Sequence, residues 1–78
     1  MWRVNVPNPL KVAVTKFPRA DADRLFAALR DLANDPLAID VYKLGNDAYY
    51  RIVDDYLIFF DLIPDRHIVN VTAIERPH

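Results

Sequence analysis

The sequence predicts a small α+β domain in which helices cover one face of an antiparallel-dominated sheet. Three patterns support this: an alternating apolar stretch near the N-terminus, a long amphipathic helical stretch before the middle of the chain, and three strand-like runs after it. Amphipathic helices and half-buried strands each have one apolar face, and these faces pack together in layers. A chain of 78 residues has room for one such domain.

The first strand is predicted at residues 2–6, where large apolar residues alternate with polar ones. Pro7 and Pro9 end this strand because proline removes a backbone donor. A proline also suits the first turn of a helix. Apolar residues then recur at helical spacing: Leu10, Val14 and Phe17. A short first helix is therefore predicted over residues 10–17.

An amphipathic helix between Pro18 and Asn34 is the clearest pattern in the chain. Its apolar side chains recur three and four residues apart: Ala22, Leu25, Phe26, Leu29, Leu32 and Ala33. Acidic residues near its start suit the positive end of a helix, and Pro36 prevents continuation past Asp35. The opposite side is interpreted as solvated: Arg24, Arg30 and Asp31.

Three strands are predicted after a polar link that carries Lys43 and Gly45. They are Ala48–Val53, Tyr56–Leu62 and Ile68–Ile74. Asp54 and Asp55 predict a tight hairpin between the first two, and residues 64–66 predict a longer turn before the third. Short turns join neighbouring antiparallel strands, so the three runs are expected to form a meander.

Side chains alternate between the two faces of a strand, which divides this meander into two sides. We expect one side to pack against the helices: Tyr50, Ile52, Tyr56, Ile58, Phe60 and Leu62. The other side would carry Tyr49, Arg51, Leu57, Phe59 and Asp61. Because this second side mixes aromatic and charged groups, we expect function there.

Composition removes several enzyme classes. The chain has no cysteine and no serine, and Gly45 is its only glycine, which excludes disulfides, thiolate metal sites, cysteine or serine nucleophiles and glycine-rich phosphate loops. We expect no cofactor and no metal. No apolar run approaches the ~20 residues of a membrane span, and the first residues lack a secretion signal, so we expect a cytoplasmic protein with no membrane partner.

The formal net charge of −1 gives no electrostatic reason to expect nucleic-acid binding. The charges are unevenly distributed, however. The first 20 residues carry four basic side chains and no acid: Arg3, Lys11, Lys16 and Arg19. One end of the chain is therefore locally basic.

From residue 9 to residue 76, an ordered set of short segments resembles the RelE/ParE superfamily of toxins from bacterial toxin–antitoxin pairs. The segments are Phe17-Pro18, Leu32-Ala33-Asn34-Asp35-Pro36, Lys43-Leu44-Gly45, Tyr50-Arg51-Ile52, Asp55-Tyr56 and Ala73-Ile74-Glu75-Arg76. The resemblance implies a toxin domain over residues 1–78, with a small antiparallel-dominated sheet and helices on one face. It also implies a cognate antitoxin, whose extended or helical segment wraps a groove of the toxin, and it allows a homodimer.

In ribonuclease members of this superfamily, an RNA 2′-hydroxyl attacks the neighbouring phosphate without a metal. This reaction needs cations around the phosphate and a proton donor for the leaving oxygen. The resemblance makes Lys43, Arg51 and Arg76 the candidate phosphate clamps, and His78 a candidate general acid or a frayed terminus. Tyr49 and Phe59 are candidates for stacking on bases, with antitoxin contact or core packing as alternatives.

The sequence also departs from the superfamily pattern. Leu57 stands where many members carry an arginine, and Arg51 alone remains of a usual arginine pair; Arg51 has the alternative of pairing with Asp61 across the hairpin. Three functions remain. The favoured one is an endoribonuclease that cleaves mRNA on the ribosome. The others are a non-enzymatic inhibitor of DNA gyrase, as in the ParE branch, and an inactive relic that only binds an antitoxin.

Overall fold

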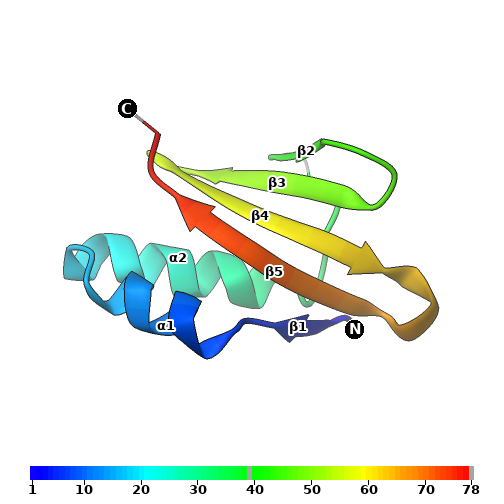
Figure 1. The fold of residues 1–78 in the computed structure, drawn as a ribbon, viewed down its shortest axis with the longest axis horizontal. Coiled ribbons are helices and arrows are strands. Elements are labelled where there is room, and N and C mark those ends of the chain that lie inside the picture. Colours follow the sequence, from blue (N-terminus) through cyan, green and yellow to red (C-terminus); the bar gives the residue numbers. More distant parts are fainter. Residues whose placement is uncertain (39, 78) are drawn as a thin grey trace.

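The computed structural model describes residues 1–38 and 40–77. These residues form a five-stranded sheet in the order β1-β5-β4-β3-β2, with both helices on the same face (Figure 1). β1 (Arg3–Asn5) lies parallel to β5 (Ile68–Glu75), and every other neighbouring pair is antiparallel. The predicted α+β fold with an antiparallel-dominated sheet is confirmed.

Both predicted helices are present. α1 (Asn8–Thr15) has a proline near its start, and α2 (Arg19–Asp31) begins directly after Pro18. α2 ends earlier than the predicted Asn34, and turns lead from Leu32 onward. Within the described residues, neither helix is long and apolar enough to span a bilayer.

The meander has one strand more than predicted. β2 (Val41–Lys43) lies in the segment interpreted as a polar link, and it pairs antiparallel with β3 (Ala48–Val53). β3 has the predicted bounds, and β4 (Tyr56–Ile63) and β5 each extend one residue further than predicted. A 3₁₀ turn, Pro64–Arg66, joins β4 to β5. The sequence pattern does not reveal β2 because Val41 and Tyr42 are both apolar, so this strand lacks the alternation that is seen around β1.

The core lies between α2 and the middle of the sheet. β4 buries alternate side chains, as predicted: Tyr56, Ile58, Phe60 and Leu62. Leu25, Leu29 and Leu32 of α2 belong to the same cluster, as do Val14, Val69 and Val71. The apolar stripe of α2 and the inner face of β4 thus supply most of the buried apolar surface, which is the main stabilising term in folding.

The predicted facing of β3 is wrong. Val53 lies opposite Tyr56 and Arg51 lies opposite Ile58, so Arg51 points to the helix side of the sheet. Tyr50 and Ile52 point to the other side. The reason lies in the hairpin. A two-residue turn at Asp54 and Asp55 places Val53 directly opposite Tyr56, and directly opposite residues point to the same face of a sheet.

A bulge changes the facing of β5 near its end. Phe59 pairs with Ala73 while Phe60 pairs with Val71, so Thr72 is an extra residue in β5. Because a bulge shifts the alternation by one residue, Ile74 packs against the core and Glu75 lies on the opposite face, across from Leu57.

Candidate functional site

The face of the sheet that points away from both helices is called the open face below. Strand register assigns its side chains: Arg3 and Asn5 from β1; Ile68, Asn70, Ala73 and Glu75 from β5; Leu57, Phe59, Asp61 and Ile63 from β4; Ala48, Tyr50 and Ile52 from β3; and Tyr42 from β2. Function was expected on this side of the sheet, but its β3 residues differ from those predicted.

Three aromatic rings form a continuous row across the open face. Tyr42, Tyr50 and Phe59 occupy directly opposite positions on β2, β3 and β4. The ring centroids are 5.4 Å apart between Tyr42 and Tyr50 and 5.9 Å apart between Tyr50 and Phe59. Tyr42 is 47% exposed at the edge of the sheet. Tyr50 and Phe59 are partly exposed, so the row presents aromatic side chains to solvent, as binding surfaces often do.

The charges on the open face are mainly acidic. Asp61 and Glu75 lie on it, and Arg3 on β1 is the cation that register assigns to it among the described residues. Asn5 donates a 2.9 Å hydrogen bond from its side-chain nitrogen to the side-chain oxygen of Asn70, next to Asp61 in the sheet. Because RNA affinity depends largely on cations that neutralise phosphates, this face has poor electrostatics for RNA.

Arg51, a predicted phosphate clamp, is inside the fold on the helix side. Its side chain is 14% exposed. The guanidinium donates to the carboxylate of Asp40 at 3.0 Å and to the backbone carbonyl of Ala28 in α2 at 2.9 Å, with Asp31 at 3.9 Å. The expected pairing with Asp61 is wrong, because Asp61 lies opposite Ala48 on the other face.

Arg76 follows β5 and remains half-exposed at the end of the sheet. Its guanidinium lies 3.8 Å from the carboxylate of Asp55 and 5.7 Å from the ring centre of Tyr56. The Tyr56 hydroxyl donates a 2.9 Å hydrogen bond to Asp21 at the start of α2. Burial raises the pKa of Tyr56, and the hydrogen bond to Asp21 raises it further. Arg76 thus belongs to a cluster that ties the β3–β4 hairpin to α2.

The remaining predicted site residues are dispersed. Lys43 is exposed at the end of β2, opposite Tyr49. Tyr49 stacks on Phe60, with ring centroids 5.8 Å apart, on the helix side, whereas Phe59 lies on the open face. The two predicted base-stacking rings therefore point to opposite sides of the sheet. His78 lies outside the described residues.

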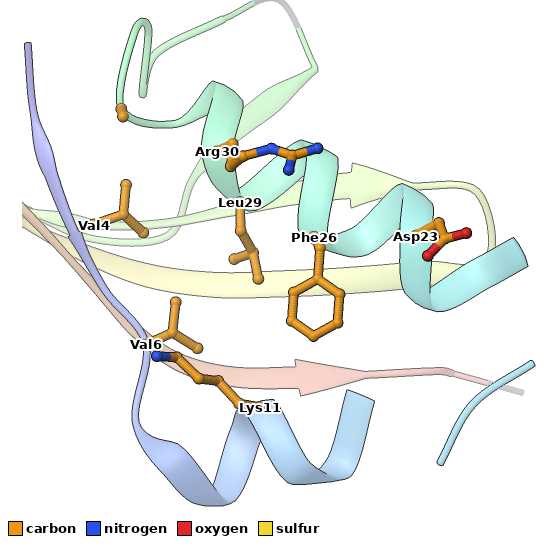
Figure 2. A pocket seen from close by; sticks show the side chains of 8 residues that line it. Val4, Val6, Lys11, Asp23, Phe26, Leu29 and Arg30 are labelled. Atoms are coloured by element: carbon orange, nitrogen blue, oxygen red, sulfur yellow. The ribbon is translucent and has the colours of Figure 1, made fainter. Parts of the chain in front are cut away.

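A groove that the sequence did not reveal lies between α1, β1 and α2. Figure 2 shows the side chains that line it, and its volume is about 700 Å³. The lining is mostly apolar, from Val4, Val6, Phe26, Leu29 and Ala33, with Lys11, Asp23 and Arg30 as the charged groups. The only sequence signal was the width of the α2 stripe, because Phe26 and Ala33 lie at its edge and remain partly exposed.

No protein-family model and no curated protein sequence matches this chain. Solved structures do match its fold. The archaeal RelE–RelB complex from Pyrococcus horikoshii OT3 matches with a TM-score of 0.88 at 20% identity, over 96% of this chain and 93% of that chain. The toxin–antitoxin complex RelBE2 from Mycobacterium tuberculosis matches with a TM-score of 0.82 at 12% identity, over 97% and 98%.

The isolated RelE toxin of E. coli also matches, with a TM-score of 0.81 at 14% identity, over all of this chain and 86% of that chain. The chain is thus a small α+β protein with the fold of RelE toxins. This confirms the fold that the sequence resemblance implied. Two of these structures are complexes: RelE with RelB in the first, and a toxin with an antitoxin in the second.

Proposed function

We propose that this chain is the toxin of a toxin–antitoxin pair and that it acts by binding a protein target through its open face. The first part is supported by the end-to-end match to RelE structures together with the ordered sequence segments that resemble the superfamily. The second part is supported by one observation above all: the aromatic row Tyr42–Tyr50–Phe59 lies on a face where carboxylates outnumber cations among the described residues.

The geometry favours this mechanism over RNA cleavage. A ribonuclease site of the expected kind needs several cations around one phosphate. Arg51 instead donates to Asp40 and to a backbone carbonyl of α2, and Arg76 faces Asp55 and the Tyr56 ring. Inhibition of DNA gyrase, which the superfamily resemblance allows, fits the aromatic row better because aromatic residues are enriched at protein interfaces.

Endoribonuclease activity on mRNA is the second candidate. It is favoured by the exposed Lys43 near the rim of the sheet and by the same aromatic row, because rings on an exposed sheet can stack on unpaired bases. Under this alternative, Tyr42 and Phe59 would hold the RNA. Lys43 on β2 and Arg76 after β5 would then contact two different phosphates, because β3 and β4 lie between their strands.

Induction of the chain in a bacterial host tests the proposal, with growth, mRNA integrity and DNA supercoiling followed together. We expect growth arrest with intact mRNA and altered supercoiling, and relief of the arrest by the protein encoded in the adjacent gene. Tyr42→Ala is expected to weaken toxicity because it removes the exposed end of the aromatic row. Val12→Ala is the matched control, since Val12 is a similarly exposed apolar residue on α1.

The outcomes separate the three functions. Cleaved mRNA after wild-type induction rejects the protein-binding mechanism and supports the ribonuclease. Normal growth with intact mRNA and unchanged supercoiling, despite tight binding of the adjacent gene product, supports an inactive antitoxin-binding protein. Equal toxicity of the Tyr42→Ala and wild-type chains rejects the open face as the site of action.

A further inference from the structure

Asp61 is an unpaired carboxylate near the centre of the open face. It lies on β4, the middle strand of the sheet, opposite Ala48 on β3 and Asn70 on β5. The residue is partly buried. Within residues 1–38 and 40–77, however, its side chain forms no ion pair and accepts no hydrogen bond from another residue. A carboxylate that is partly removed from water and has no protein partner favours a cation from another molecule.

Two aromatic rings lie beside Asp61 on the same face. Phe59 precedes it by two positions on β4, and Tyr50 is its diagonal neighbour on β3. Diagonal neighbours in a sheet lie ~7–8 Å apart, which is within reach of long and aromatic side chains. The faces of aromatic rings attract cations that approach within ~6 Å of the ring centre. The two rings and the carboxylate therefore favour the same kind of ligand group.

The neighbours of Asp61 leave room for such a group. Ala48 has only a methyl group, so no long side chain occupies the position opposite Asp61 on β3. On the β5 side, Asn70 accepts a hydrogen bond from Asn5, and this neutral pair adds no charge. Arg3 lies on β1, which β5 separates from β4. In the part of the chain that the structure describes, no cation of the chain itself is paired with Asp61.

We propose that Asp61, Tyr50 and Phe59 form a binding site for an arginine side chain of the target protein. The guanidinium donates to the carboxylate of Asp61 and stacks on an aromatic ring, and its aliphatic part lies over Ala48. This inference rests on the proposed function. It adds the chemical group that the open face recognises on the target.

Arginine fits this site better than lysine or a phosphate. A guanidinium is planar, donates to both oxygens of one carboxylate and stacks on aromatic rings, whereas an ammonium is a compact, strongly hydrated charge. Phosphates are repelled, because Asp61 and Glu75 both lie on the open face. The exposed side chains of Tyr42 and Ile52 extend the apolar surface beyond the site. They suit apolar residues on either side of the arginine in the target.

NMR titration of the full isotope-labelled chain tests the site. The probe is a blocked tripeptide with arginine between two leucines. Its matched control carries citrulline in place of arginine, because citrulline keeps the shape and removes the charge. We expect the arginine peptide to shift the amide signals of Ala48, Tyr50 and residues 59–61, with a Kd in the millimolar range. The citrulline peptide should bind at least ~5-fold more weakly, because it makes neither the ion pair nor the cation–π contact.

Variants of the chain test whether Asp61 holds the peptide. Asp61→Asn keeps the shape and removes the charge, so the arginine peptide should bind at least ~5-fold more weakly and lose its advantage over the citrulline peptide. Glu75→Gln is the matched control, because it removes the same charge from the same face at an exposed position opposite Leu57. It should change the affinity by less than ~2-fold. Thermal melting checks that the variants are folded. If Asp61→Asn unfolds the chain, Tyr50→Leu decides the question, with an expected loss of affinity of about 3-fold because the ring is removed.

Induction in the bacterial host tests whether the target uses this site. Asp61→Asn is expected to relieve the growth arrest at equal expression, whereas Glu75→Gln should retain it. Full toxicity of Asp61→Asn with intact mRNA overturns the inference and leaves the proposed function standing. Cleaved mRNA after wild-type induction rejects the proposed function, and with it the assignment of the arginine to a target protein.

The titrations give two further outcomes that overturn the inference. Equal weakening by Asp61→Asn and Glu75→Gln shows general attraction of cations to an acidic face. Uridine monophosphate is the probe for a nucleotide in the same place. Larger shifts of the same amide signals with this nucleotide than with the arginine peptide would assign the site to RNA.

Discussion

Arg51 on β3 donates a 2.9 Å hydrogen bond to the backbone carbonyl of Ala28 in the C-terminal half of α2. The same guanidinium donates to Asp40, in the segment that leads into β2. One side chain thus joins the helix layer, the sheet and the connection between them. Arginine suits this position because its planar guanidinium carries several N–H donors in fixed directions, so that one side chain can bind acceptors on different elements.

Arg51→Ala is therefore expected to destabilise the fold by about 1–3 kcal/mol, because it leaves a half-buried carboxylate without its main donor. Arg51→Lys should recover part of this loss, since lysine keeps the charge but not the fork. Chemical denaturation measures the difference. Arg30→Ala is the control: it removes an exposed cation of α2 that forms no ion pair among the described residues and should change stability by no more than ~0.5 kcal/mol. An unchanged denaturation midpoint for Arg51→Ala would show that the contacts of Arg51 with Ala28 and Asp40 do not stabilise the fold.

Tyr56 is expected to make the free energy of unfolding depend on pH in the alkaline range. Burial and the hydrogen bond to Asp21 raise its pKa in the folded state above the ordinary value of 10.0. Between the unfolded and the folded pKa, the unfolded chain binds fewer protons, so stability falls as pH rises. The contribution of Tyr56 is complete below pH 10 and is lost above it. The melting temperature of the wild type should decline through this window more steeply than that of Tyr56→Phe, which has no group to ionise there. Parallel curves would contradict this assignment.

Phe59 and Phe60 are neighbours in β4 with opposite surroundings, and they provide a test of the sheet facing. Phe60 is 1% exposed in the core cluster, so Phe60→Ala should cost ~3–5 kcal/mol, a large part of the ~5–15 kcal/mol of a typical domain. Phe59→Ala removes an equal volume from the open face and should cost clearly less. Urea denaturation of both variants measures the contrast. A larger loss for Phe59→Ala would mean that the two faces are assigned the wrong way round.

Asp54 adopts a positive φ of 53° in the turn between β3 and β4, and its carboxylate accepts from Arg24 of α2. Asparagine tolerates this backbone conformation, so Asp54→Asn isolates the loss of an exposed ion pair, which is expected to be small. A β-branched residue does not tolerate a positive φ. The Asp54→Val variant should therefore be less stable than the Asp54→Asn variant by ~1–2 kcal/mol. Equal stability of the two variants in urea would show that the turn relaxes without cost.

The two helices and the strands β3, β4 and β5 were predictable because each has a local pattern of sufficient length. The stripe of α2 runs over three turns, and residues 56–62 of β4 form a nearly continuous apolar and aromatic run between two turn signals. The turn at Asp54 and Asp55 was also recognised from its residues alone. Combined with the inward position of Tyr56, that turn already implies that Arg51 faces the helices, a step that the sequence prediction did not take.

Other features depend on pairing between distant segments. β2 is a strand because β3 offers it a hydrogen-bonded edge, and Thr72 is a bulge only relative to Phe59 and Phe60. The burial of Arg51 depends on where the carbonyl of Ala28 comes to lie. The α1–α2 groove exists because the two helices, whose apolar sides are each visible in the sequence, leave a space between them above β1. Local periodicity indicates the type of an element and, where one side is clearly more apolar, as in α2, its buried face, because both follow from the geometry of a single backbone segment. The spacing between elements follows from side-chain packing across them and creates the groove, whereas the open face exists because both helices lie on the other side of the sheet.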